Sequence, residues 1–329
     1  MAALGSTSSG AFWGDYRRVR DIGRGQYGVV CLLLRASDGH RLVAKQIAVS
    51  GLSAHDRDKA TREVSILQRM RHPHVVAFVD SFVGGPRGAT LSIVMEYCAG
   101  GTLQQRIRTQ HGAPFPEARV RTWCAQLVSA LGHIHAHHVL HRDLKTANVM
   151  LHGDSAKVCD FGISRALSDT SPFAETAIGT PYYLCPEIVE GKAYGEPADV
   201  WSLGVVLYEV ATLQRPFVGD NMLALSRAIL ACTPPPAAET RAGAQLPEAF
   251  HRILAACLVL DPAERARLPQ LADADYLRAD VSKIEARASG MPGLSPLKVP
   301  GEARGECSLA DGGAGAGEEG SGGLGAGSG

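Results

Sequence analysis

The sequence predicts an α+β fold made of two lobes, a strand-rich lobe followed by a larger, mainly helical lobe, with a cleft between them. Two observations predict this order. The first ~85 residues carry short apolar stretches separated by turn residues, and after Gly100-Gly101 the apolar residues recur at helical spacing. The chain has 329 residues, which is enough for one large domain or two small ones.

The strand-rich part contains five stretches rich in Val, Ile and Leu, separated by Gly, Pro or Asp turns. They are residues 16–21, 28–35, 40–48, 75–83 and 90–97. One helix interrupts these strands and ends before His72-Pro73. Its apolar stripe at helical spacing consists of Ala60, Val64, Leu67 and Met70.

The helical part contains four long stretches with helical periodicity. They are residues 116–138, 197–213, 220–232 and 247–258. Toward the C-terminus the composition changes, because residues 291–329 hold 13 of the 37 glycines and no aromatic residue follows Leu277. Such a segment buries too little apolar surface to fold. The predicted organisation is a disordered leader at 1–12, a folded domain at 13–283 with lobes at about 13–97 and 98–283, and a flexible Gly-rich tail at 284–329.

Charge and composition exclude several classes of function. Lys plus Arg and Asp plus Glu both number 33, so the chain lacks the positive charge typical of proteins that bind nucleic acid or an anionic membrane. No apolar run reaches the ~18 residues of a membrane span. The eight cysteines form no C-x-x-C pair, which is typical of a reduced protein of the cytoplasm or nucleus. The tail shows no heptads, so no coiled coil for dimerisation is expected.

A glycine-rich run, Gly-Arg-Gly-Gln-Tyr-Gly-Val-Val, occupies residues 23–30 between two predicted strands. Glycines let a backbone turn tightly and approach phosphate groups. The same G-x-G-x-x-G pattern opens dinucleotide-binding folds, but a helix must then follow, whereas residues 29–34 are predicted as a strand. The sequence contains no G-x-x-x-x-G-K-[ST], which excludes a P-loop nucleotide triphosphatase. A structural turn without a ligand is an equal alternative at this point.

A lysine lies inside an apolar strand 15 residues farther on, in Val43-Ala44-Lys45. An unpaired ammonium group is costly in such a place, so Lys45 needs an anionic partner. Glu63, on the helix that follows, can supply one. A lysine held by a carboxylate is positioned to reach the phosphates of a nucleotide. A surface lysine on a strand is the simpler alternative.

The strongest signal is His-Arg-Asp-Leu-Lys-Thr-Ala-Asn at residues 141–148, followed by Asp160-Phe161-Gly162. Asp143 can accept a hydroxyl proton, and Lys145 can neutralise a phosphoryl group in transfer. Asn148 and Asp160 can chelate magnesium. Phosphoryl transfer requires mainly positioning and charge compensation, and these residue types supply both.

Together these motifs resemble those of the eukaryotic protein kinases. The resemblance covers residues 16–277. A lysine two residues after Asp143, here Lys145, resembles the pattern of the serine/threonine kinases rather than that of the tyrosine kinases. The segments 179–187 (Gly-Thr-Pro-Tyr-Tyr-Leu-Cys-Pro-Glu) and 93–98 (Ile-Val-Met-Glu-Tyr-Cys) are similar to the NIMA-related kinases in particular. The resemblance implies the bilobal protein-kinase fold, whose small lobe is an antiparallel sheet with one main helix. It also implies a serine/threonine kinase that transfers the γ-phosphoryl group of ATP to Ser and Thr hydroxyls of proteins.

The resemblance further implies a nucleotide site. Met95 would be the gatekeeper at the back of this site, and backbone groups of Glu96 and Cys98 would bind adenine. The residues implied to enclose the adenine ring are Ile22, Val30, Ala44 and Met150. The glycines implied to lie over the phosphates are Gly23, Gly25 and Gly28. ATP with Mg²⁺ is the implied cofactor, with Mn²⁺ as an alternative to Mg²⁺.

An activation segment is implied after Asp160. Thr176 matches the position of the activating phosphosite in the NIMA-related pattern, and its phosphate would meet Arg142 and Arg165. Thr180 is implied to contact the catalytic residues directly.

A buried ion pair is implied between Glu187, at the end of this segment, and Arg265 near the end of the domain. One departure from the family pattern is Cys185, where Ala or Ser is usual.

The sequence allows three hypotheses for the function. They are an active serine/threonine kinase, a pseudokinase or scaffold with the same fold, and a small-molecule phosphotransferase. The first is favoured because Lys45, Asp143 and Asp160 are all present, together with a peptide-docking segment at 179–187. The cysteine usage favours the cytoplasm with the nucleus as an alternative, and the family resemblance adds the centrosome or cilium and a role in the cell cycle as alternatives.

The histidines at the end of the 116–138 stretch need a separate weighing. His133, His137 and His141 are spaced i, i+4, i+8, which could align metal ligands on one face of a helix. The favoured interpretation is a helix end leading into the 141–148 segment, because no Cys or carboxylate shares that spacing.

Overall fold

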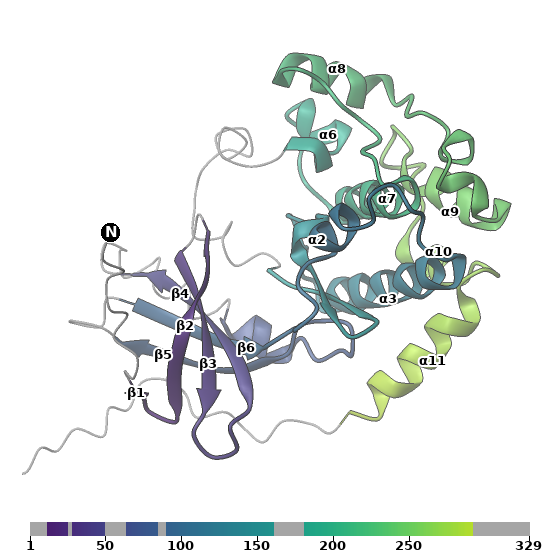
Figure 1. Cartoon of the computed structure of the whole chain (residues 1–329). Coiled ribbons are helices and arrows are strands. Elements are labelled where there is room, and N and C mark those ends of the chain that lie inside the picture. The colour runs from purple at the N-terminus through teal and green to yellow at the C-terminus, as the bar shows by residue number, and fades with distance from the viewer. Residues whose placement is uncertain (1–11, 26–27, 50–63, 85–89, 161–180, 292–329) are drawn as a thin grey trace, which may run out of the picture. The chain divides into compact units, whose positions relative to one another are not determined.

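The computed structural model describes residues 12–25, 28–49, 64–84, 90–160 and 181–291. Along the chain, the strands of one large sheet come first and the long helices follow (Figure 1). Residues 64–69 are helical and lie within the helix predicted before Pro73. The strand-rich and helix-rich order predicted from the sequence is therefore confirmed.

The sheet has the strand order β1-β2-β3-β4-β6-β5, and every pair of neighbours is antiparallel. Its strands are β1 (Phe12–Trp13), β2 (Tyr16–Gly25), β3 (Gly28–Arg35), β4 (Arg41–Ala48), β5 (Phe78–Gly84) and β6 (Thr90–Glu96). β5 begins later than the predicted residue 75, because Val75 and the N–H of Val76 pair instead with Val158 in the helical part.

The two faces of the sheet pack against different cores, since successive side chains of a strand point to opposite faces. On one face a small cluster gathers around Tyr16, and its other buried members are Cys31, Leu33, Leu42, Ala44 and Val94. The opposite face carries Ile47 and Ile93, which belong to the main core shared with the helices. Lys45 pairs directly with Ile93 and is placed on this second face.

The helical part is organised around α7 (Glu196–Thr212), whose residues from Ala198 to Thr212 are all buried. A helix that is apolar on all sides belongs in the middle of a domain. Trp201 of α7 stacks on Phe217, with ring centroids 5.3 Å apart. The other helices are α2 (Leu103–Arg108), α3 (Glu117–Ala136), α6 (Pro186–Val189), α8 (Met222–Ala231), α9 (Glu248–Cys257), α10 (Leu268–Ala272) and α11 (Arg278–Ser289).

The predicted long helices correspond to α3, α7, α8 and α9, with ends that differ by two residues or fewer. The sequence reasoning missed the short hairpin of β7 (Val149–His152) and β8 (Ser155–Val158), which follows the catalytic motif. None of the helices in the described part is both long and apolar enough to cross a membrane.

The expected domain boundaries need correction at both ends. Phe12 belongs to β1, so the described fold starts one residue before position 13. At the other end α11 continues to Ser289, past the expected boundary at residue 283. Ile284 is buried in the main core together with Val281, which anchors the last turns of α11. The first six residues assigned to the tail are therefore part of a packed helix.

Candidate active site

The predicted catalytic segment, residues 141–148, follows α3 and is held by a fully buried carboxylate on α7. Asp199 accepts hydrogen bonds from the backbone N–H groups of His141 (2.8 Å) and Arg142 (3.0 Å). The side chains of His135 and Tyr194 donate to the same carboxylate, each at 2.7 Å. These four hydrogen bonds fix the start of the catalytic segment to the central helix.

The charge of Asp199 is maintained by its partners. Burial by itself would raise the pKa of the carboxyl group, but the hydrogen bond from His135, the nearby His141 and the hydrogen bond from Tyr194 together lower it. Burial lowers the pKa of His141, whose imidazole is therefore neutral at neutral pH. Arg142 has a φ of +65°, a left-handed conformation that a side-chain-bearing residue adopts only when its surroundings impose it.

Asp143, Lys145 and Asn148 converge within the segment. The amide nitrogen of Asn148 donates to the backbone carbonyl of Asp143 at 2.8 Å and to its Oδ2 at 2.9 Å. The ammonium group of Lys145 donates to the same Oδ2 at 2.7 Å. Half of the Asp143 side chain is exposed, so the carboxylate is oriented by two neighbours and still open to solvent.

Lys45 of β4 reaches across to the residue that follows β8 by two positions. Its Nζ atom lies 2.9 Å from Oδ1 of Asp160, and the lysine is almost fully buried. Asp160 has a φ of +57°, a second left-handed residue in this region. The partner expected for Lys45 from the sequence, Glu63, lies outside the described residues.

A small cavity lies beside this ion pair and is lined by residues of both the strand-rich and the helical part. Lys45, Met95, Cys159 and Asp160 contribute to its lining, which is completed by Leu67, Val76 and Ile93. Cys159 donates its backbone N–H to the carbonyl of Asn148 at 3.0 Å. The predicted gatekeeper, lysine and metal-binding aspartate are thus brought to one place.

The segment after β6 is held against β7. The N–H of Gly100 donates to the carbonyl of Leu151 at 2.9 Å, and the N–H of Leu151 donates to the carbonyl of Gly101 at 2.8 Å. These bonds place Glu96 and Cys98 next to the strand that carries Met150.

Strand alternation corrects one predicted adenine contact. Ala44 is paired with Cys31 and Val94 and lies in the small cluster on the face opposite Lys45. The expectation that Ala44 encloses the adenine ring is therefore wrong. Val43 shares the face of Lys45, since the two are separated by one strand period, and it pairs with Met95. Counting two residues back from Lys45 would have found it.

The glycines and Ile22 all belong to the β2–β3 hairpin. Gly28 is the position where glycine is required, because its φ is +136° and an added Cβ would lie 1.7 Å from the carbonyl oxygen of Gln46. At Gly23 the nearest atom to such a Cβ would be 3.9 Å away, in Val30. Ile22 is exposed on β2, and Gly25 pairs with Gly28 at the end of the hairpin.

A second buried network, which sequence reasoning missed, joins the catalytic segment to residues 181–183. Thr146 and Tyr183 each donate a hydroxyl hydrogen bond to Oε2 of Glu209 on α7, at 2.9 and 2.5 Å. Arg215 pairs with Oε1 of the same carboxylate at 3.2 Å, and its guanidinium lies 3.8 Å from the ring centroid of Tyr182. The end of the activation segment is therefore fixed to the same central helix as the catalytic segment.

The ion pair predicted between Glu187 and Arg265 is confirmed. The two NH groups of Arg265 donate to the two carboxylate oxygens at 2.8 and 3.1 Å, and both side chains are buried. Arg265 also donates to the carbonyls of Val259 and Pro197, and its guanidinium lies 5.1 Å from the ring centroid of Trp201.

Three predicted residues of the activation segment, Arg165, Thr176 and Thr180, lie outside the described residues. The three histidines proposed as an alternative metal site do not converge. His137 donates its Nδ1–H to the carbonyl of His133 at 2.9 Å, while His141 turns its Nδ1 to the N–H of Asp143. Their interpretation as a helix end leading into the catalytic segment fits these contacts.

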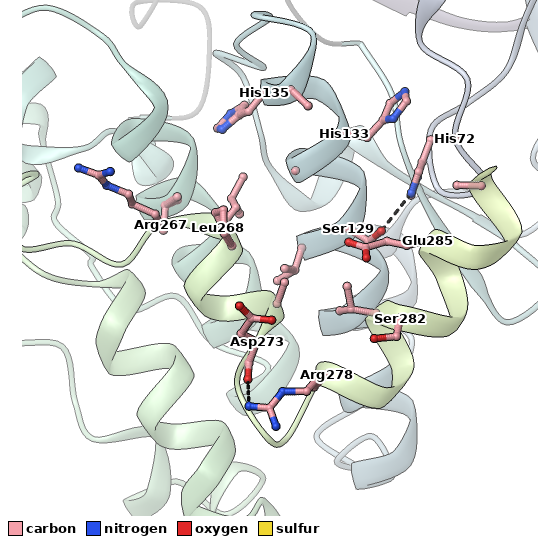
Figure 2. A pocket seen from close by; sticks show the side chains of 18 of the residues that line it. His72, Ser129, His133, His135, Arg267, Leu268, Asp273, Arg278, Ser282 and Glu285 are labelled. Atoms are coloured by element: carbon pink, nitrogen blue, oxygen red, sulfur yellow. Dashed lines mark hydrogen bonds between the residues drawn. The ribbon is translucent and has the colours of Figure 1, made fainter.

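A separate cavity lies in the helical part, and none of the residues predicted for catalysis or nucleotide binding line it. Figure 2 shows it beside α10 and α11, with Ser129 hydrogen-bonded to His72 at its wall at 3.1 Å. The lining mixes charges of both signs, including Arg267, Asp273 and Glu285, so it does not select one ligand chemistry.

Comparison with known sequences shows which family the chain belongs to. The profile of the "Protein kinase domain" matches residues 16–277. The chain belongs to the protein kinase family. Mouse "Serine/threonine-protein kinase Nek1" is 42% identical over 222 residues, which are 67% of this chain and 18% of that protein. Human "Serine/threonine-protein kinase Nek5" is 43% identical over 209 residues, 63% of this chain and 29% of that protein.

These relatives place the protein among the NIMA-related serine/threonine kinases. Similarity extends to "Serine/threonine-protein kinase nekl-2" of Caenorhabditis elegans, 37% identical over 64% of this chain and 61% of that protein. The chain thus spans less than two thirds of the length of these curated relatives. The observed antiparallel sheet followed by helices is the bilobal protein-kinase fold, and the family as a whole uses ATP, a divalent cation and protein substrates.

Proposed function

We propose that this protein transfers the γ-phosphoryl group of ATP to Ser and Thr hydroxyls of protein substrates. One observation carries the proposal: the Asp143, Lys145 and Asn148 cluster is locked to α7 by Asp199, and the Lys45–Asp160 ion pair lies one β-hairpin away. A pseudokinase would not need this set of oriented charges.

The nucleotide would bind along β2, β3 and the segment after β6. Backbone groups of Glu96 and Cys98 bind adenine, and the residues that enclose the ring are Ile22, Val30, Val43 and Met150. Gly28 lets the hairpin backbone lie close to β4, so that the glycine-rich turn can cover the phosphates without side-chain obstruction. Lys45 holds the α- and β-phosphates, since its ammonium group already pairs with an anion at this place.

The residues present fit a magnesium ion. Mg²⁺ prefers oxygen ligands, and Asp160 supplies a carboxylate while Asn148 supplies an amide oxygen. Because Nδ2 of Asn148 donates to Asp143, its Oδ1 is the atom turned to a cation. When bound, the ion neutralises charge on the phosphates; Mn²⁺ fits the same ligands.

Asp143 would act on the substrate hydroxyl. Its carboxylate is half exposed, so a serine or threonine side chain can reach it. The proton of the hydroxyl passes to a carboxylate oxygen as the hydroxyl oxygen attacks the γ-phosphorus, and the bond from that phosphorus to the bridging oxygen breaks to release ADP. Lys145 lies 2.7 Å from the same carboxylate and offsets the charge of the transferring group.

A radiolabelled phosphate-transfer assay on a degenerate Ser/Thr peptide array tests the proposal. We expect transfer by the wild-type protein and a loss of several orders of magnitude in Asp143→Asn, with ATP binding retained, because Asn keeps the shape but cannot take the proton. Asp275→Asn, at an exposed aspartate of the helical part, serves as the control. Full activity in Asp143→Asn protein freed of contaminating kinase would refute the enzyme assignment.

We also propose that phosphorylation of Thr176 activates the enzyme. Arg142 supports this, because Asp199 holds its backbone next to the catalytic base in a left-handed conformation, and a phosphothreonine offers acceptors suited to its guanidinium. Intact-mass analysis after incubation with ATP should show phosphate that Thr176→Ala removes, together with a fall in kcat. Wild-type activity of Thr176→Ala, with phosphate on another residue, would refute this assignment.

A further inference from the structure

A cluster of three side chains lies beside the predicted adenine-binding segment and has no assigned role. Glu96 ends β6, Cys98 follows two residues later, and His152 ends β7. One ligand atom from each, a carboxylate oxygen, a thiol sulfur and an imidazole nitrogen, lie within 4.8 Å of one another. In the part of the chain that the structure describes, these three side chains form a group of Glu, Cys and His whose ligand atoms come close enough to hold a metal ion together.

The distances fit coordination better than hydrogen bonding. Nδ1 of His152 lies 3.6 Å from Oε1 of Glu96, which is too long for a hydrogen bond. Two ligand atoms on one tetrahedral ion, each with a bond of about 2.0 Å, are separated by roughly 3.3 Å. The three ligand atoms lie within 4.8 Å of one another, so binding requires them to approach by roughly 1 Å, and the exposed His152 side chain can rotate toward the other two.

The backbone fixes the geometry of the cluster. The two hydrogen bonds between residues 100–101 and Leu151 hold the segment that carries Cys98 against β7, which carries His152. Glu96 is fixed as well, because its Oε2 accepts hydrogen bonds from Lys157 at 2.8 Å and from the N–H of Ala77 at 3.3 Å. These contacts occupy Oε2 and leave Oε1 facing His152.

We propose that Glu96, Cys98 and His152 bind one zinc ion, with water as the fourth ligand. A set of one thiolate, one imidazole and one carboxylate suits Zn²⁺, whereas Mg²⁺ prefers oxygen ligands only, so this site is chemically distinct from the one at Asn148 and Asp160. Binding replaces the thiol proton of Cys98, which passes to solvent. His152 is largely exposed and gives the ion a path of entry.

The ion would link the segment after β6 to the β7–β8 hairpin. The proposed function uses only backbone groups of Glu96 and Cys98, so the zinc site does not compete with adenine for the same atoms. Whether zinc binds does not depend on phosphoryl transfer, and binding can therefore be measured without an activity assay.

Cobalt is the probe for the ligand set, because thiolate coordination to Co²⁺ gives a charge-transfer band in the near ultraviolet. The full chain is titrated with Co²⁺ in excess Mg²⁺, and Zn²⁺ affinity is measured by competition with a chelator. We expect one equivalent to bind and the band to be absent in Cys98→Ser. Cys232→Ser, at a half-buried cysteine of the helical part, is the matched control and should keep the band.

His152→Ala separates a metal site from a folding effect, since His152 is exposed. We expect its Zn²⁺ affinity to fall by at least the ~10–100-fold that loss of supporting groups costs at zinc sites. Zinc should raise the Tm of the wild-type chain but not of His152→Ala, because only a ligand of the folded state stabilises it. His111→Ala, at another exposed histidine, should behave as wild type.

Lys157→Met tests the role of Glu96. Removing the ammonium group 2.8 Å from Oε2 should tighten Zn²⁺ binding, since the carboxylate then keeps more of its charge for the ion. A charge-transfer band that survives in Cys98→Ser, or an unchanged Zn²⁺ affinity in His152→Ala, would overturn the proposal. An unchanged Zn²⁺ affinity in Lys157→Met would remove Glu96 from the ligand set.

Discussion

At the scale of single residues, the catalytic segment depends on Asp199, a side chain outside the motifs used in the sequence analysis. The fully buried Asp199 binds two backbone N–H groups at the start of the catalytic segment and two further side chains. In Asp199→Asn the amide keeps one acceptor oxygen and turns an NH₂ group toward donors. Hydrogen bonds to charged groups contribute about 1.5–3 kcal/mol each, so we expect a clear loss of Tm and of kcat. Asp275→Asn, at an exposed carboxylate, is the control.

The effect of Asp199→Asn on the Tm should depend on pH. The pKa of Asp199 is lowered in the folded state, so its contribution to stability is present above the unfolded pKa of about 3.9 and is lost as the pH falls through the folded pKa. The difference in Tm between wild type and Asp199→Asn should therefore be full at pH 7 and shrink below about pH 4. A difference that is constant across this range would show that the charge of Asp199 contributes nothing.

At the scale of elements, the Glu187–Arg265 pair joins α6 to the loop between α9 and α10. Removing one partner of a buried pair leaves the other charge uncompensated and costs about 3–5 kcal/mol, so Arg265→Ala should lower the Tm markedly. Arg265→Lys should recover only part of the loss, since an ammonium group cannot bind both carboxylate oxygens and the carbonyls together. Arg267→Ala, at an exposed arginine two residues away, should leave the Tm unchanged. Equal melting curves for Arg265→Ala and wild type would contradict this account.

The elements also show what the sequence could predict. Strands β2 to β6 and helices α3, α7, α8 and α9 follow from apolar periodicity, because each is long enough to show its period. Asp199 and Glu209 were missed in the sequence analysis, because their roles depend on contacts that only the three-dimensional structure shows. Both lie in an otherwise apolar helix, and their hydrogen-bond partners are distant in sequence. Ala44 was misplaced because the strand alternation relative to Lys45 was not applied: Val43 shares the face of Lys45, and the pairing of Ala44 with Val94 places Ala44 on the other face.

At the scale of the whole molecule, a few polar contacts join the strand-rich part to the helical part. Lys45 binds Asp160, His74 bonds to the carbonyl of Ala156, and Lys157 binds Glu96. Each of these contacts involves the β7–β8 hairpin or the residues next to it. The apolar periodicity of the sequence did not predict this hairpin. Its contacts hold the residues predicted to bind the nucleotide close to the catalytic residues.

The C-terminal boundary of the catalytic unit can be tested by two truncations. Deleting residues 292–329 removes no residue of α11, so we expect wild-type kcat and Tm. Deleting residues 284–329 also removes Ile284 and the last turns of α11, and burying one such side chain contributes about 1.5–3 kcal/mol. Its Tm should therefore fall, although both truncations lack the glycine-rich segment. If the two truncations melted alike, α11 would not stabilise the domain beyond residue 283. If the shorter deletion cost most of the peptide-kinase activity, residues 292–329 would have to take part in substrate docking or regulation.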